Sequence, residues 1–195
     1  MNACDWFLQN PLAKDYHDKE WGTPVHSDEK MFEFLLMESM SCGLSWMLML
    51  KKRSIFKKCF AGFDVKKVAR FTDEDVSRIL QTPGMIRSER KIRAMIHNAG
   101  VFIEIAREFG SFCEYLWGFT GGKTLIYRSH QQGVLETHNA LSDAIAKDLK
   151  KRGYKYMGTV TLFSHLQGVG IINDHSKSCP RYGELLKMAK VEKRK

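Results

Sequence analysis

The sequence predicts a mostly α-helical protein, and three observations lead to that prediction. Apolar residues recur in long runs with helical spacing, and several runs follow residues that commonly cap helices. Glycine and proline divide these runs into segments of helical length. No stretch alternates between apolar and polar residues over many positions, so we expect no sizeable sheet. A chain of 195 residues suits one domain or two small lobes.

Composition and charge narrow the class of protein. The chain is 44% hydrophobic, which indicates a globular protein, and no apolar run is long enough to span a membrane. The first ten residues lack the basic and then apolar pattern of an export signal, so we expect a cytoplasmic protein. The five cysteines are then reduced thiols or metal ligands. The net charge of +9 favours nucleic acid as a partner, although an inert basic surface would give the same total.

The N-terminal segment up to residue 30 is rich in aromatic residues and helix breakers. Pro11, Gly22 and Pro24 interrupt it, and we expect a loop with short turns. Aromatic residues in irregular segments usually cover a core or line a pocket, which makes Tyr16 and Trp21 candidates for a pocket.

The stretch from Met31 to Trp46 predicts the central helix of the fold. Ser27 is a suitable N-cap, and the residues that follow are apolar on all sides, which indicates a core helix. Glu38 lies within this run, where an unpaired carboxylate costs several kcal/mol. It is either an acid paired with a lysine or arginine at the edge of the core, or an acid lining a pocket for a cationic ligand. Gly43 marks the end of the helix.

We expect the remaining chain to form further short helices. A helix from Ser45 to Phe60 carries a basic face with Lys51 and Lys52, which is either solvated or faces phosphates. Arg87, Arg90, Lys91 and Arg93 oppose the dipole at the start of another helix, which hints at a bound anion. The other expected elements are helices over 64–69, 72–81, 88–108, 141–152 and 159–166, and a brief extended piece over 124–127.

A glycine-bounded turn separates the last two of these helices. Residues 153–158 follow a basic stretch that includes Lys151, and Lys155 lies within the turn. Such a hairpin offers backbone N–H groups to a phosphate, although a generic contact between two helices fits the sequence equally well. We expect residues 1–185 to form a single domain and residues 186–195 to form a basic, disordered tail.

Two pairs of metal-ligating residues lie at opposite ends of the chain. Two thiols and two imidazoles form a four-coordinate set that suits Zn²⁺ and leaves no open position, which is typical of a structural site. Asp18 or Asp174 could orient a ligand imidazole by accepting a hydrogen bond from the ring nitrogen that does not bind the metal. The candidate ligands are Cys4, His17, His175 and Cys179. Because the two pairs are far apart in sequence, their spacing alone does not establish that they meet.

Taken together, these residues resemble the 3-methyladenine DNA glycosylase I family over nearly the whole chain, from about residue 4 to residue 179. The set of motifs is far more specific than any one of them. The matching stretches are 16–22 (YHDKEWG), Glu38 with 43–46 (GLSW), 50–53 (LKKR), 150–153 (KKRG) and 173–175 (NDH).

The resemblance implies a two-lobed helix-hairpin-helix DNA glycosylase-like fold with a structural zinc site joining the termini. It implies a monomeric DNA repair enzyme that acts on double-stranded DNA containing alkylated bases. The enzyme hydrolyses the N-glycosidic bond of 3-methyladenine with water as the nucleophile, releases the free base and leaves an abasic site. Cys4, His17, His175 and Cys179 match the zinc ligands.

The resemblance also assigns the other site residues. Glu38 matches the catalytic carboxylate that contacts the base, and Tyr16, Trp21 and Trp46 match aromatic residues of the base pocket. The expected DNA contacts are Gly43, Leu44, Lys51, Lys52, Lys151 and Lys155. The chain departs from the family at Met40 and Ser41, where many members have glutamines, and at Ala13, where some have an aromatic residue.

Two rival functions fit part of the sequence. A non-catalytic nucleic-acid-binding module would explain the basic charge and the metal ligands but leaves Glu38 among apolar residues unexplained. A binder of free methylated purines would use the same pocket without depending on the basic helices. Release of free base from methylated DNA separates both from the glycosylase.

Overall fold

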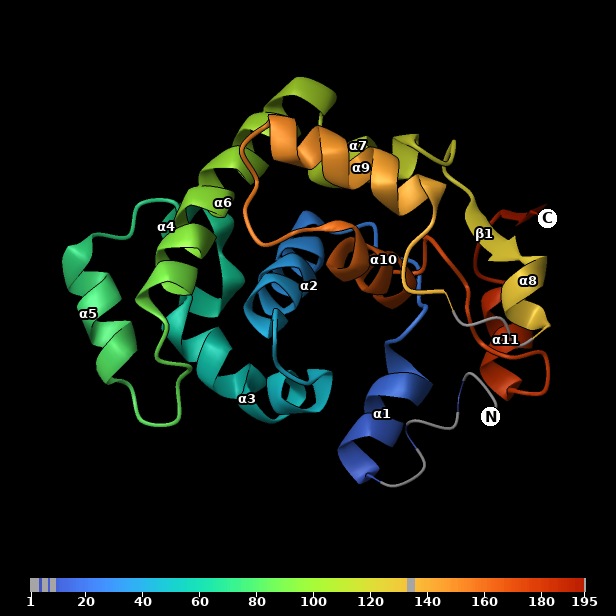
Figure 1. The fold of residues 1–195 in the computed structure, drawn as a ribbon, viewed down its shortest axis with the longest axis horizontal. Coiled ribbons are helices and arrows are strands. Elements are labelled where there is room, and N and C mark those ends of the chain that lie inside the picture. Colours follow the sequence, from blue (N-terminus) through green and yellow to red (C-terminus); the bar gives the residue numbers. More distant parts are fainter. Residues whose placement is uncertain (1–3, 5–6, 8–9, 133–135, 195) are drawn as a thin grey trace.

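The computed structural model of the protein describes residues 4, 7, 10–132 and 136–194. Helices dominate the described chain, as predicted, and its two short strands form a single small sheet (Figure 1). None of the described helices combines the length and apolar character needed to cross a membrane. The helices are α1 (Pro11–Lys19), α2 (Asp28–Ser41), α3 (Trp46–Cys59), α4 (Val65–Val68), α5 (Asp73–Gln81), α6 (Glu89–Phe109), α7 (Phe112–Gly118), α8 (Arg128–Gln131), α9 (Ala140–Lys151), α10 (Thr159–Gly168) and α11 (Pro180–Leu185), and a 3-10 turn spans Ala61–Phe63.

Helix α2 lies at the centre of the fold, where α3, α6, α7 and α10 pack around it (Figure 1). It begins as predicted, because the Ser27 side chain accepts a hydrogen bond from the backbone N–H of Lys30. Asp28, in its first turn, accepts hydrogen bonds from the backbone N–H groups of Phe112 and Cys113 at 3.0 and 2.9 Å. One carboxylate thereby ties the start of α2 to the start of α7.

The end of α2 is also stabilised from outside. Gly43 has a φ of +79°, a left-handed conformation that L side chains rarely adopt, and the chain turns there into α3. Lys91 of α6 donates hydrogen bonds to the carbonyl oxygens of Met40 and Cys42 at 2.9 and 2.5 Å. These are among the last carbonyls of α2, so the lysine complements the negative end of the helix.

The basic start of α6 therefore has partners within the protein. Besides Lys91, the Arg93 guanidinium donates to Asp73 at 2.6 Å and to Glu89 at 2.8 Å. Arg90 donates to the Tyr156 hydroxyl. Three of the four basic residues that oppose the dipole at this helix start thus have hydrogen-bond partners within the described protein, and Arg93 is paired with acids.

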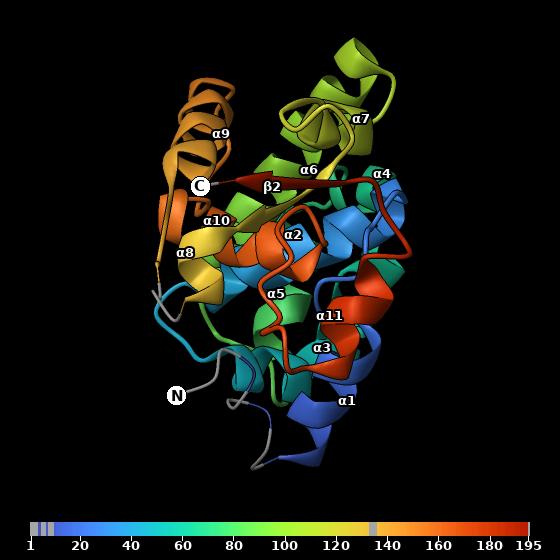
Figure 2. The ribbon, with the colours of Figure 1, turned by 90° about the vertical axis from the view of Figure 1, so that its right-hand side faces the viewer.

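Two segments differ from the sequence prediction. Helix α1 forms where we expected loops and turns, because Asn10 caps it through the backbone N–H of Leu12 and Pro11 occupies its first position. The basic tail is not disordered in its described part. Strand β2 (Val191–Arg194) pairs in parallel with β1 (Thr124–Tyr127), the extended piece that the sequence predicted (Figure 2).

Candidate functional site

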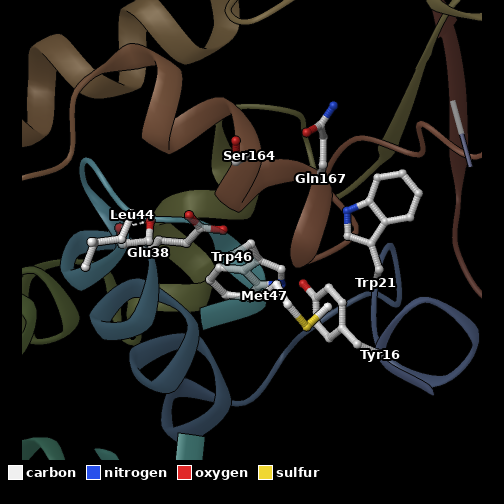
Figure 3. Close-up of a pocket in the computed structure, with 9 residues that line it drawn as sticks. Tyr16, Trp21, Glu38, Leu44, Trp46, Met47, Ser164 and Gln167 are labelled. Atoms are coloured by element: carbon white, nitrogen blue, oxygen red, sulfur yellow. Dashed lines mark hydrogen bonds between the residues drawn. The ribbon is translucent and has the colours of Figure 1, made fainter. Parts of the chain in front are cut away.

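A cavity of about 420 Å³ lies beside the carboxyl-terminal half of α2. Helices α1 and α10, the turn after α2 and the first residues of α3 supply the rest of its wall (Figure 3). Its size suits a small organic ring system. The lining residues are Tyr16, Trp21, Glu38, Ser41, Leu44, Trp46, Met47, Ser164 and Gln167.

Glu38 brings an acid into this apolar surrounding. The residue is only 6% exposed, and burial raises the pKa of its carboxyl to about 8, although the Ser41 side chain lowers it slightly by hydrogen bonding. No lysine or arginine of the described chain acts on this pKa. The carboxyl group is therefore a buried acid without a cation, in a wall of a cavity.

Aromatic rings line the cavity next to Glu38. The ring centroids of Tyr16 and Trp46 are 5.5 Å apart, and Phe34 lies behind both at 6.2 and 6.5 Å. Burial and the charge of Glu38 raise the pKa of the Tyr16 hydroxyl, so this group stays neutral. Faces of aromatic rings attract cations, and a planar cationic ring would meet both the rings and the acid here.

Trp21 connects the cavity with a second cluster of polar residues. Its indole lines the cavity, and the ring centroid of His175 lies 4.5 Å away. The Trp21 carbonyl oxygen lies 3.0 Å from Nε2 of His175. The position of this cavity wall thus depends on His175.

The four predicted metal ligands meet at this point. Their ligand atoms lie within 4.8 Å of one another. Cys179 Sγ lies 3.5 Å from His175 Nδ1 and 3.7 Å from His17 Nε2, and Cys4 Sγ lies 3.7 Å from His175 Nδ1. In a tetrahedral zinc site with ordinary bond lengths, sulfur and nitrogen ligands are about 3.6 Å apart. The donor set and its spacing therefore fit a four-coordinate metal ion.

The partners of the two imidazoles fix which ring nitrogen faces the cluster. Asp18 Oδ1 lies 2.8 Å from Nδ1 of His17, and the Trp21 carbonyl holds Nε2 of His175. This leaves Nε2 of His17 and Nδ1 of His175 for a metal. Asp18 therefore contacts a candidate ligand imidazole as expected, whereas Asp174 contacts His130 at 2.5 Å.

The candidate DNA-contacting residues lie in two separate regions: the turn after α2 with helix α3, and the turn between α9 and α10. Gly43 and Leu44 are exposed in the turn at the rim of the cavity, and Lys51 is exposed on α3. Lys52 is partly buried and donates to the Gly84 carbonyl oxygen. Lys151 and Lys155 are exposed at the turn between α9 and α10.

Sequence reasoning missed two polar residues of the cavity. Ser164 and Gln167 are three positions apart in α10, so they share one face of the helix, and both line the cavity. The signal was a polar pair about one turn apart in a helix that also contains Thr159, Thr161 and His165. It could not be placed without knowing which face of α10 meets α2.

Comparison with known proteins decides the family. A family model described as methyladenine glycosylase matches residues 6–182, which is most of the chain. The protein belongs to the methyladenine glycosylase family. The resemblance drawn from the sequence motifs is thereby confirmed.

Relatives in this family are similar over their full length. DNA-3-methyladenine glycosylase 1 of Escherichia coli is 38% identical, with 93% of this chain and 97% of that protein covered. A crystal structure of a 3-methyladenine DNA glycosylase I is 40% identical, with a TM-score of 0.86 over 92% of this chain and 98% of that one. A structure of a Y16F variant of 3-methyladenine DNA glycosylase I in complex with 3-methyladenine is 32% identical, with a TM-score of 0.85 over 92% and 97% of the chains.

The three residues that depart from the family pattern lie at different positions relative to the cavity. Ser41 lines the cavity, whereas Met40 is fully buried and is not part of the cavity wall. Ala13 is likewise fully buried, in α1. Of the three positions, only Ser41 adds a polar group to the pocket.

Proposed function

We propose that this protein is a DNA-3-methyladenine glycosylase, which hydrolyses the N-glycosidic bond of 3-methyladenine in alkylated DNA and leaves an abasic site. The observation that carries the proposal is the buried, unpaired carboxyl of Glu38 in a ring-lined cavity of suitable size. The relatives named for this activity support it. We further infer that residues 1–185 act as one glycosylase domain and that the enzyme works as a monomer.

The positive charge of the damaged base explains why so few catalytic groups are needed. Methylation at N3 makes adenine cationic while it is still attached to the sugar, so it leaves readily without a strong acid. The enzyme extrudes the nucleotide from the duplex, which costs a few kcal/mol. The cationic base then meets the faces of Tyr16 and Trp46, worth about 0.5–2 kcal/mol for each contact.

Glu38 selects the charged base over normal adenine. The cationic base lowers the pKa of the nearby carboxyl, so Glu38 ionises as the base enters and accepts a charge-assisted hydrogen bond from its edge. A neutral purine does not lower the pKa of Glu38, so it does not stabilise the ionised form of this buried acid. No described residue of the cavity wall is a lysine that could attack the sugar, which supports water as the nucleophile and a monofunctional enzyme.

The Cys4, His17, His175 and Cys179 cluster would hold one structural zinc ion. The spacing of the four ligand atoms and the second partner on each imidazole support this assignment. The ion would join the start of the chain to its end and, through Trp21, stiffen the cavity wall. Elemental analysis should find one zinc per chain in wild type and less than a tenth of that in Cys179→Ser. Equal metal contents would contradict the assignment.

The turn between α9 and α10 would be the hairpin of a helix-hairpin-helix motif and would bind the DNA backbone. Gly153 in this turn has a φ of +88°, and the exposed Lys151 and Lys155 flank it. Gly43 and Leu44 would enter the duplex at the lesion from the other side of the cavity, and the cavity would lie between two lobes. Binding should weaken steeply with salt, and Lys151→Gln with Lys155→Gln should reduce that slope by about two. A slope that does not change would reject this surface.

The proposed activity is tested by release of free base from methylated DNA. Wild type should release 3-methyladenine, and Glu38→Ala should release it at least a hundredfold more slowly while remaining folded. Exposed Glu108, changed to alanine, is the control for removing an acid elsewhere. Wild type that binds methylated DNA but releases no base would instead favour the non-catalytic module.

A further inference from the structure

A second cavity, separate from the one beside α2, gathers positive charge. Its volume is about 310 Å³, and the two cavities share no lining residue. Four cationic side chains line it from three parts of the chain: Arg128 begins α8, Lys177 precedes α11, and Lys193 and Arg194 belong to β2. Figure 2 shows these three elements on the side of the molecule that faces the viewer. Among the described residues, no acid lines this cavity.

Most of this charge has no acid to balance it. Arg194 donates to Glu192 at 3.0 Å. Arg128, Lys177 and Lys193 form no ion pair with any acid of the described chain. Like charges around one cavity repel one another, so an anion between them would stabilise the arrangement.

Another cavity of the protein shows the contrasting case. Arg152 lines it together with Asp148, and the two side chains form an ion pair at 2.7 Å. The same guanidinium donates to Glu108 at 2.6 Å. There the protein neutralises its own cation, whereas the cavity beside β2 leaves three cations for a ligand.

The pairing of the two strands brings part of this charge to the cavity. Strand β2 pairs with β1 in a register that sets Lys193 opposite Ile126. Opposite residues in a sheet share one face, and both of these side chains line the cavity. The C-terminal basic segment, which its composition marks as solvated, is thus held by backbone hydrogen bonds with its cations at the cavity.

The cavity also has an apolar part. Ile126 is 3% exposed, and the half-buried Tyr182 lies beside it in the lining. Within the described residues the ring of Tyr182 has no aromatic partner. Aromatic side chains stack on nucleobases of any sequence. Cations at the rim and a free ring face in the wall match a molecule that carries an anionic group and a planar ring.

We propose that this cavity binds a nucleotide through its terminal phosphate, with the phosphate among Arg128, Lys177 and Lys193 and the base on Tyr182. A terminal phosphate carries about two negative charges at pH 7, whereas a phosphate within a strand carries one. Three unpaired cations around a concave site favour the group with the higher charge. A free nucleotide and the phosphorylated end of a strand both carry it. The inference goes beyond the proposed function, because the cavity beside α2 takes no part in it.

Binding of thymidine 5′-monophosphate to the full chain tests the site, with isothermal titration calorimetry as the measurement. A pyrimidine is used because the cavity beside α2 is proposed to take a purine. Thymidine lacks the phosphate, and the methyl ester of the nucleotide carries only one charge. Lys193→Gln and Arg128→Gln each remove one cation at an exposed position, so both variants should fold like wild type. Lys66→Gln, exposed on α4 and outside this cavity, is the matched control.

Wild type should bind one nucleotide per chain. The methyl ester, thymidine and inorganic phosphate should each bind about tenfold more weakly or worse. Lys193→Gln and Arg128→Gln should each weaken nucleotide binding about tenfold, and Lys66→Gln should leave it unchanged. Lys151→Gln with Lys155→Gln should also leave it unchanged, which separates this site from the proposed DNA surface.

Competition distinguishes the two sources of the phosphate. A duplex with 5′-phosphates that displaces the nucleotide better than the same duplex with 5′-hydroxyls assigns the site to strand ends, and equal competition assigns it to free nucleotides.

Other results would overturn the inference. No detectable nucleotide binding, or equal affinity in wild type, Lys193→Gln and Arg128→Gln, would reject the site. Inorganic phosphate that binds as tightly as the nucleotide would reject the role of Tyr182. None of these measurements depends on base release, so the proposed function and this inference can fail separately.

Discussion

A pair of half-buried acids and one buried acid lie close together in this protein, and their surroundings differ in charge. Glu20 and Glu33 share Arg53, whose guanidinium donates to both oxygens of Glu20 at 2.6 and 2.7 Å and to Glu33 at 2.6 Å. Lys30 contacts the same two acids at 2.9 and 3.0 Å. Glu38, little more than one turn beyond Glu33 on α2, has no such cation among the described residues.

The pKa values of Glu20 and Glu38 are shifted in opposite directions. Burial raises the pKa of Glu20, but the hydrogen bonds and charges of Arg53 and Lys30 outweigh it and lower the pKa to about 2. Burial without a cation raises the pKa of Glu38 to about 8. Among the described residues, the fold thus supplies cations to the neighbouring acids and none to Glu38. We propose that a cationic ligand takes this place.

The largest effect on stability is expected for Glu38→Gln. The folded-state pKa of Glu38 lies above its ordinary value of 4.5. The contribution of the protonated carboxyl to the free energy of unfolding is therefore fully present below pH 4.5 and is lost as the pH rises to about 8. Glutamine has no proton to lose. The variant should therefore gain stability over wild type by up to about 1.4 kcal/mol per pH unit between these limits.

Urea unfolding of both proteins from pH 5 to pH 9 measures this difference. It should grow up to pH 8 and then stay constant. A constant difference across the whole range would mean that Glu38 keeps its ordinary acidity in the folded protein, and the contrast with Glu20 would disappear.

Arg53→Met should act in the opposite direction. It removes one of the two cations that contact both acids and leaves Lys30 alone to balance two partly buried carboxylates, which should destabilise the protein by about 3 kcal/mol at pH 7. Lys19→Met breaks an exposed ion pair with Asp15 on α1 and serves as the control, with no measurable change expected. If both variants unfold at the wild-type urea concentration, the Arg53 network does not stabilise the fold.

A smaller effect is expected for His165→Leu. His165 is fully buried, and neither ring nitrogen has a hydrogen-bond partner within the described structure. The variant should be about 1 kcal/mol more stable at pH 7, because it removes a buried polar group without partners. Burial lowers the pKa of His165 to about 3, so wild type should lose further stability as the pH falls below 6.5, and the variant should lose less. Parallel pH profiles of thermal unfolding would contradict this account.

Local signals in the sequence were sufficient for much of the fold. The start of α2 at Ser27 and its end near Gly43 follow from capping preferences that depend on a few neighbouring residues. Strand β2 could not be predicted, because its hydrogen bonds come from β1, more than sixty residues earlier in the chain. A charged tail alone gives no sign of such a partner.

The residues of the candidate site also differ in whether the sequence alone could identify them. Glu38 could be identified because a single acid in a long apolar run is anomalous wherever the helix packs. Gln167 could not, because it lines the cavity only through the packing of α10 against α2. Nothing local in the sequence indicates that packing.

The most direct test of the central claim is the pH dependence of base release. The second-order rate constant for 3-methyladenine release, kcat/KM, reports the acidity of the free enzyme and should be measured between pH 6 and pH 9 for wild type and Glu38→Gln. If Glu38 must ionise to receive the cationic base, the wild-type rate should rise with pH and level off near pH 8, and the variant should be at least a hundredfold slower with no such rise. Identical profiles in the two proteins would contradict the claim that this carboxyl recognises the charged purine.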